Sequence, residues 1–390
     1  MLRVVLAVMA VAAMLGGLPA RAELSVAVGY LRVDVPLPPT LSNLDPVPDD
    51  LGIAGAEVGL ADNATTGRFL GHGYGLRVVR VPVDGDVAGA ARALLGETRL
   101  VLVDAPADTL LEIADLPEAR SALLFNVAAR DNRLRDGACR GNLLHTIPSD
   151  AMRTDALAQF LVRKRWTDVA LIEGTTPADV QFADALRRSM TKFGLKLRGQ
   201  NTWAFDADMR RNAAQEVPVF TQAFKEYDVL LVADAADDFA RYIPFNTWEP
   251  RPVAGSAGLR PMAWSRVVEQ WGAAQLQSRF ADHAGRDMQP KDYAAWAALR
   301  SIGEAVTRTG VGDAATLRAF LLSDAFELGG FKGRPLSYRG WNGQLRQPIA
   351  LVGPRALVAT APMEGFLHAR NELDTLGLDR PESACTAFGG

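Results

Sequence analysis

Residues 100–126, LVLVDAPADTLLEIADLPEARSALLFN, decide the fold prediction. Two short aliphatic runs, 100–104 and 122–126, flank a segment, 109–116, whose apolar residues recur at helical spacing. Aliphatic runs of this length, separated by a helix, indicate parallel strands that are buried on both faces. Since crossovers between parallel strands are right-handed, the segment predicts one unit of a doubly wound sheet.

The same alternation continues on both sides of this segment. Toward the N-terminus we expect strands at 24–30 and 76–81 and helices at 54–63 and 86–95. A second series begins at Pro148-Ser149-Asp150, which is a helix-start signal with a capping residue. It predicts helices at 151–165, 178–193 and 217–225 and strands at 168–173, 196–203, 229–233 and 253–256. Helical segments at 265–284, 291–309 and 314–322 and strands near 336–339, 349–352 and 356–360 follow.

This order predicts an α/β protein with two doubly wound parallel-sheet lobes joined by a multi-strand hinge. We place the first lobe at 23–147 with about 262–330, and the second at 148–261 with about 331–368. The remaining residues, 369–390, form a C-terminal tail tied to the first lobe. A chain of 390 residues is long enough for two such cores.

The N-terminus has the pattern of an export signal. Arg3 precedes an apolar run, 4–15, and Ala20-Arg21-Ala22 has the small-x-small form of a cleavage site. The run is shorter than the roughly 20 residues of a membrane span, and the first cysteine, Cys139, lies too far on for a lipid anchor. We therefore expect residues 1–22 to be removed and a monomeric periplasmic protein without a membrane anchor to remain.

Charge and cysteine content narrow the possible partners. Without Arg3 and Arg21, 40 of the 42 Lys and Arg remain against 45 Asp and Glu, a net charge of −5, which argues against nucleic acid. The two cysteines, Cys139 and Cys385, form no C-x-x-C motif and have no neighbouring histidine pair. In an oxidising compartment they favour one structural disulfide over a metal or redox site.

Catalytic patterns are weak throughout the chain. The serine of Gly255-Ser-Ala-Gly258 lacks the G-x-S-x-G spacing of a nucleophile elbow. The four histidines are scattered, so they predict no zinc-binding pair, and Asp237-Asp238 is more typical of a solvated loop or helix start than of a metal site. Residues 71–75, GHGYG, precede a strand rather than following one, so a turn is favoured over a phosphate loop. We expect no enzyme, no metal and no required cofactor.

Three segments carry a family resemblance. Residues 55–67, GAEVGLADNATTG, resemble the first helix of the branched-chain-amino-acid-type periplasmic binding proteins. Residues 144–150, LHTIPSD, resemble the crossover into their second lobe, and 292–300, DYAAWAALR, with 304–306 resemble their late helix. The resemblance covers nearly all of 23–370 and implies a type I fold that captures a small molecule for an ABC permease.

A narrower resemblance is to the subgroup that accompanies pyrroloquinoline quinone (PQQ)-dependent alcohol dehydrogenase systems. Its residues include Asp62-Asn63, Cys139-Arg140, 250–255 (PRPVAG), 341–346 (WNGQLR) and 373–377 (LDTLG). This similarity implies PQQ as a bound ligand and a PQQ-dependent dehydrogenase or a permease as partner. Two alternatives stay open: a receptor for another small anionic or aromatic solute, and a ligand-free accessory or sensor subunit of a dehydrogenase system.

The candidate site lies where the strands end, because helix N-termini and free amides converge there. Amino-acid-binding relatives present Ser and Thr after their third and fourth strands, whereas here 105–108 read APAD and 127–133 read VAARDNR. Arg130 and Arg133 fit a carboxylate ligand, with a solvated loop as the alternative.

Aromatic side chains near the second-lobe loops add the possibility of stacking on a flat ligand. Tyr242, Trp248 and Trp264 are candidates, with a core position as the alternative. Arg260 next to the hinge is either a ligand clamp or part of an interlobe ion pair. The predicted ligand-binding set, which suits a planar polyanion such as PQQ, is Arg130, Asn132, Arg133, Thr175, Asp234, Trp248, Arg260 and Trp264.

Overall fold

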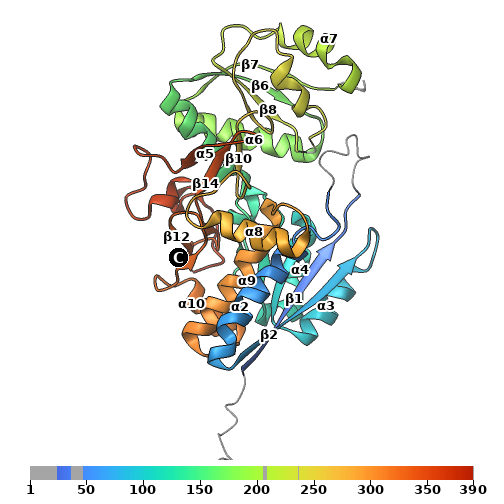
Figure 1. Cartoon of the computed structure of the whole chain (residues 1–390), viewed down its shortest axis with the longest axis vertical. Helices are drawn as coiled ribbons and strands as arrows, with labels where there is room; N and C mark the ends of the chain where they lie inside the picture. The colour runs from blue at the N-terminus through green and yellow to red at the C-terminus, as the bar shows by residue number, and fades with distance from the viewer. Residues whose placement is uncertain (1–23, 37–46, 205–208, 236, 390) are drawn as a thin grey trace, which may run out of the picture.

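The computed structural model describes residues 24–36, 47–204, 209–235 and 237–389. The predicted export signal, 1–22, lies outside this range. Within the range, no helix is long and apolar enough to cross a membrane. The described chain folds into two α/β lobes stacked along the long axis of the molecule (Figure 1).

The first lobe contains a five-stranded, all-parallel sheet in the order β2-β1-β3-β4-β5. Its strands are β1 (Leu24–Val33), β2 (His72–Val81), β3 (Leu100–Asp104), β4 (Leu123–Asn126) and β5 (Leu143–His145). Its helices are α2 (Ile53–Leu70), α3 (Val87–Glu97), α4 (Ala107–Asp115), α8 (Ala273–Ala284), α9 (Pro290–Thr309), α10 (Ala314–Leu321) and the short 3-10 turns η1 (Pro117–Ser121) and η2 (Asn132–Arg135).

Helices cover both faces of this sheet, as the aliphatic strands require. Leu100 and Leu102 of β3 pack in one cluster with α2 and α9, whereas Val101 and Val103 pack in another with α3 and α4. The two helices α2 and α9 touch so closely that a Cβ on Gly55 would lie 2.0 Å from the backbone oxygen of Asp292. The late helix α9 is therefore an integral part of the first lobe.

The second lobe contains a four-stranded parallel sheet in the order β7-β6-β8-β9. Its strands are β6 (Asp168–Glu173), β7 (Lys196–Thr202), β8 (Val229–Ala233) and β9 (Val253–Gly255). Its helices are α5 (Asp150–Lys164), α6 (Pro177–Phe193), α7 (Met209–Thr221) and η3 (Ala240–Phe245). The hydroxyl of Ser149 accepts a hydrogen bond from the amide of Met152 and so caps α5, as the Pro-Ser-Asp sequence predicted.

A three-stranded antiparallel sheet, which we call the hinge sheet, joins the lobes. It consists of β10 (Arg260–Met262), β14 (Ile349–Val352) and β15 (Leu357–Ala361). Alternate residues of β14 face different cores: Ala350 and Val352 pack with the first lobe, and Ile349 and Leu351 with the second. Below it, β11 (Leu328–Gly329), β12 (Pro335–Tyr338) and β13 (Leu345–Arg346) form a second small sheet.

The predicted fold class is confirmed, while several element bounds differ. The predicted lobe boundaries stay a prediction. Within 331–368, which we assigned to the second lobe, Leu336, Tyr338 and Leu345 pack in the core of the first lobe. The segment 265–272 forms turns, and α8 begins only at Ala273, after Gly272 in the left-handed region. The expected turn at 71–75 is largely strand, because β2 begins at His72 immediately after Gly71 ends α2.

The C-terminal tail follows the last strand and contains η4 (Glu372–Thr375) and η5 (Arg380–Glu382). The predicted disulfide between Cys139 and Cys385 is present, with their Cα atoms 5.7 Å apart. It joins the tail to the loop between η2 and β5 of the first lobe.

Candidate functional site

A cleft of about 1260 Å³ lies between the two lobes. The loops after β1, β3 and β4 contribute its first-lobe wall, and the loops after β8 and β9 contribute the second-lobe wall. Arg260 and Met262 of the hinge sheet line it as well. The cleft thus occupies the position where the carboxyl ends of parallel strands are expected to form a site.

The first turns of four helices also reach the cleft wall. Ala107 of α4, Asp150 of α5, Pro177 of α6 and Pro290 of α9 all line it. Helix N-termini carry partial positive charge and unpaired amides, so their convergence favours a negatively charged group.

Most acidic side chains in the cleft already have a cationic partner. Asp104 is 2.8 Å from Lys291, Asp108 is 2.7 Å from Arg133, and Asp150 is 2.8 Å from Arg153. Each of these carboxylates would have to release its partner to bind a ligand ammonium group. Asp234 on the second-lobe wall is an exception, because its Oδ1 has no hydrogen-bond partner among the described residues.

Arg130 lines the cleft but does not take part in these ion pairs. It follows β4 on a tight loop in which Asn126 accepts hydrogen bonds from the amides of Ala128 and Ala129. The backbone oxygen of Arg130 accepts a hydrogen bond from the amide of Asp150 at 2.9 Å. Its guanidinium, however, forms no hydrogen bond or ion pair with any part of the chain that the structure describes.

Burial and the nearby Arg153 together lower the pKa of Arg130 to about 10, with Asp150 opposing the shift. The side chain therefore remains a cation at neutral pH. A charged group without a direct partner in a partly dehydrated position is costly, and a ligand anion would remove that cost.

Arg260 is a second guanidinium on the cleft wall without a partner among the described residues. It lies on β10 of the hinge sheet and is exposed. Among the residues that the structure describes, none forms with it the interlobe ion pair that we considered. Arg130 and Arg260 together give the cleft two positions for anionic groups.

A family model described as a periplasmic binding protein matches residues 81–355, well over half of the chain. The chain belongs to the periplasmic binding protein family. No curated protein matches its sequence.

Solved structures of similar fold agree with this assignment. The binding protein is similar to a periplasmic ligand-binding protein of a branched-chain amino acid ABC transporter from Burkholderia xenovorans, with a TM-score of 0.71 and 16% identity over 93% of this chain and 100% of that one. A leucine-, isoleucine-, valine-, threonine- and alanine-binding protein from Brucella ovis has a TM-score of 0.65 and 13% identity, over 85% of this chain and 90% of that one. A solute-binding protein from R. palustris, solved in complex with benzoate, has a TM-score of 0.63 and 12% identity, over 93% of this chain and 99% of that one. At such identities these likenesses show the type I fold alone.

The structure brings four of the eight predicted ligand-binding residues to the cleft of the binding protein: Arg130, Arg133, Asp234 and Arg260. Arg133 is paired with Asp108 and with Asp131, so its charge is already compensated. Asp234 uses one carboxylate oxygen to accept hydrogen bonds from the amides of Phe239 and Ala240, each at 2.8 Å. Burial raises the pKa of Asp234, and these amide hydrogen bonds oppose the shift; its other oxygen, Oδ1, has no hydrogen-bond partner among the described residues.

The other four predicted residues do not line the cleft. Asn132 accepts a hydrogen bond from the amide of Ala151, and Thr175 is exposed in the loop before α6. Trp248 is 58% exposed on the second lobe outside the cleft wall. Trp264 is only 3% exposed, because its ring stacks on Tyr293 at a centroid distance of 4.8 Å within the first-lobe core.

Sequence reasoning missed an aromatic wall residue. Phe182 of α6 is the aromatic side chain that the described part of the chain brings to the cleft, and the guanidinium of Arg153 lies 4.8 Å from its ring centroid. Lys291, on α9, was also missed, because its partner Asp104 lies on a strand far away in the sequence. Only the helical spacing of 178–193 hinted that Phe182 faces inward.

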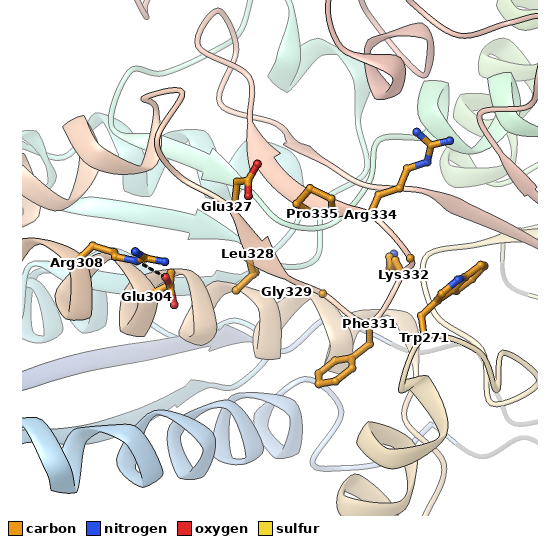
Figure 2. A pocket seen from close by; sticks show the side chains of 12 residues that line it. Trp271, Glu304, Arg308, Glu327, Leu328, Gly329, Phe331, Lys332, Arg334 and Pro335 are labelled. Atoms are coloured by element: carbon orange, nitrogen blue, oxygen red, sulfur yellow. Dashed lines mark hydrogen bonds and ion pairs between the residues drawn. The ribbon is translucent and has the colours of Figure 1, made fainter.

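A second, smaller hollow of about 540 Å³ lies between the end of α9 and the β11–β12 hairpin (Figure 2). Its arginines are paired: Arg308 with Glu304 at 2.8 Å, and Arg334 with Glu372. Lys332 turns its ammonium group inward, where it donates to Gln347 at 2.5 Å. Unlike the interlobe cleft, this hollow therefore has no unpaired cation among the described residues that line it.

The described residues do not gather a metal-binding cluster. No cluster of three or more His, Cys, Asp or Glu side chains is found there. His145 is fully buried, and burial together with Arg135 lowers its pKa well below the usual value. Ser256 lines the cleft, but its hydroxyl accepts a hydrogen bond from the amide of Asp234.

Proposed function

We propose that this binding protein captures a small planar anion in the periplasm and delivers it to an ABC permease or to a PQQ-dependent dehydrogenase. PQQ is the ligand that we favour. The unpaired Arg130 guanidinium on the cleft wall carries the proposal, because a carboxylate is its natural partner.

The distribution of charge supports an anion over a zwitterion. The carboxylates of Asp104, Asp108 and Asp150 are each occupied by a cation of the protein itself. A ligand that carries carboxylates alone can use Arg130 and Arg260 without displacing any of these pairs. An amino acid would also need an acidic group for its ammonium, and Oδ1 of Asp234 is the carboxylate oxygen on the wall that could serve.

The size and surface of the cleft support a flat ligand. Its volume of about 1260 Å³ exceeds the range of 300–1,000 Å³ that is typical of small-molecule pockets, so the space accommodates a fused ring system. Phe182 offers a ring face, although Arg153 already lies against it. PQQ is a fused aromatic quinone that bears carboxylates, and the narrower sequence resemblance points to the same compound.

A second candidate ligand class is a small aromatic carboxylate. The R. palustris neighbour was solved in complex with benzoate, which combines one carboxylate with one aromatic ring. Such a ligand would use Arg130 but would leave Arg260 unoccupied. A ligand-free accessory role would leave both arginines without partners.

Calorimetric titration of the purified protein with PQQ, benzoate, leucine and glutamate tests the proposal. We expect saturable binding of PQQ that leucine does not displace. Binding of benzoate alone would favour the second candidate. Binding of leucine or glutamate in preference to both aromatic compounds would refute a planar-anion site.

A further inference from the structure

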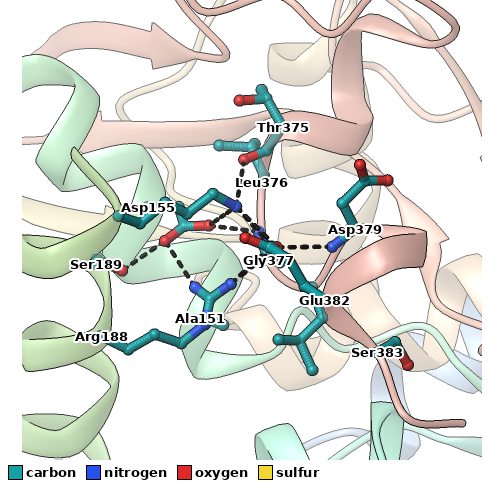
Figure 3. Close-up of polar contacts among 12 residues, drawn as sticks. Ala151, Asp155, Arg188, Ser189, Thr375, Leu376, Gly377, Asp379, Glu382 and Ser383 are labelled. Carbon is teal, nitrogen blue, oxygen red and sulfur yellow. Dashed lines mark hydrogen bonds and ion pairs between the residues drawn. The ribbon is translucent and has the colours of Figure 1, made fainter.

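The C-terminal tail holds the second lobe through a dense polar cluster (Figure 3). Asp155 of α5 is completely buried and accepts hydrogen bonds from the amide of Gly377 at 2.8 Å and from Ser189 at 2.5 Å. Arg188 and Lys192 of α6 form ion pairs with the Asp155 carboxylate, with nitrogen-to-oxygen distances of 3.0 and 3.1 Å. Since Gly377 belongs to the tail, one buried carboxylate joins the tail directly to two helices of the second lobe.

The same two cations also bind the tail directly. Arg188 and Lys192 each donate to the backbone oxygen of Gly377 and to the carboxylate of Glu382, at 3.0–3.1 Å. The chain lies so close to α5 that a Cβ on Gly377 would be 2.7 Å from Cγ of Met152, and its φ of 83° is in the left-handed region. Only glycine is well suited to this position.

A few residues later, the tail holds the first lobe. The hydroxyl of Ser383 donates to the backbone oxygen of Arg135 at 2.7 Å, and the amide of Ala384 donates to Asp136 at 2.6 Å. The disulfide from Cys385 to Cys139 follows. These partners lie at the end of η2 and in the loop that follows it, and Leu134 of η2 packs in the first-lobe core.

We propose that residues 377–385, here called the strap, limit how far the two lobes can part. Its ends are fixed to α5 and α6 on one lobe and to the loop at Cys139 on the other. Rotation about a hinge changes the distance between groups on opposite lobes, so a short segment fixed to both lobes limits that rotation. A strap of eight peptide units spans at most about 28 Å, so wider separation of these two attachments requires that the ionic attachment release or the disulfide break.

The two attachments differ in kind. The first-lobe end is covalent, whereas the second-lobe end depends on Arg188, Lys192 and buried hydrogen bonds. When the lobes part, the ion pairs and hydrogen bonds to the second lobe are therefore expected to break before the disulfide does. The proposal concerns the ligand-free protein and does not depend on which ligand the cleft takes.

Pulsed dipolar spectroscopy on the full chain tests the strap. Ketone-bearing amino acids at Glu112 of α4 and Val180 of α6, both exposed, would carry spin labels without added cysteines. We would compare the parent with a Cys139→Ser/Cys385→Ser variant and an Arg188→Gln/Glu382→Gln variant. Arg187→Gln is the matched control, because Arg187 neighbours Arg188 on α6 but pairs with Glu173 and Asp184 rather than with the tail.

We expect one narrow interlobe distance distribution for the parent and the control. Both strap variants should broaden it and add a population at longer distance. The Arg188→Gln/Glu382→Gln variant keeps the disulfide, so it decides the question if the cysteine variant does not fold. A folded strap variant, verified by circular dichroism, whose distribution matches that of the parent would overturn the proposal.

Discussion

The cleft around Arg130 and the cluster around Asp155 differ in how their charged groups are paired: Arg130 is half-buried and unpaired, whereas Asp155 is buried and fully paired. Asp155 has four donors within hydrogen-bonding distance, two of them cationic, and is completely buried. The Arg130 side chain has no direct partner among the described residues, although burial lowers its pKa. A cluster whose charges are all paired stabilises one fixed arrangement. An unpaired charge on a cleft wall instead contributes to the free energy of binding when a ligand anion pairs with it.

The largest loss of stability should follow from removing the Asp155 carboxylate from its cluster. Asp155→Ala removes one partner from a buried ionic group and leaves Arg188 and Lys192 without it, which costs about 3–5 kcal/mol of stability. Chemical denaturation of the second lobe would measure the loss. Asp184→Ala is the control, because its exposed pair with Arg187 should contribute at most about 1 kcal/mol. Equal losses in both variants would contradict the difference between buried and exposed pairs.

The next effect concerns the cleft around Arg130. Arg130→Ala should weaken anion binding by about 1.5–3 kcal/mol, the range for hydrogen bonds to charged groups. That corresponds to a roughly tenfold to hundredfold higher Kd. Because no protein group loses a side-chain partner, the thermal stability should not fall as it does in Asp155→Ala. Unchanged PQQ affinity in a calorimetric titration would remove Arg130 from the site.

The tail should make a pH-dependent contribution to stability. Burial alone would raise the pKa of Glu382, but the amide of Asp379, Lys192 and Arg188 outweigh it, and the net pKa is lowered. A lowered folded-state pKa means that this stabilisation is present above the unfolded-state value, about 4.3. It is lost as the pH falls through the folded-state pKa. The difference in melting temperature between the parent and Glu382→Gln should therefore shrink below pH 4; a constant difference down to pH 2 would contradict this assignment.

The smallest effect is expected at Arg133, three residues from Arg130. Its pairs with Asp108 and Asp131 are half exposed, and such pairs contribute about 0–1 kcal/mol. Arg133→Ala should change the Kd for PQQ less than about threefold. A loss as large as that of Arg130→Ala would show that both arginines bind the ligand.

The main features of the fold were predictable from local sequence. The run 100–104 is aliphatic at every position but the last, and only a strand covered on both faces buries all of it. The disulfide was predictable because the chain has two cysteines and no competing motif. Arg130 was predictable as a cleft residue because it follows a buried strand.

The rest depends on contacts between distant residues. A tryptophan such as Trp264 suits a ring stack in a core as well as on a ligand, and only the position of Tyr293 decides between them. Likewise, Arg133 and Arg130 are equivalent candidates in the sequence. They are distinguished by Asp108 of α4, which forms an ion pair with Arg133. The tail cluster has no local pattern, since Asp155, Arg188 and Gly377 meet only in three dimensions.

A crystal structure of the protein grown with PQQ would test the central claim most directly. We predict a ligand carboxylate within hydrogen-bonding distance of the Arg130 guanidinium, with the Asp104–Lys291 and Asp150–Arg153 pairs intact. PQQ bound outside the cleft, or bound within it while Arg130 remains without a partner, would contradict the account.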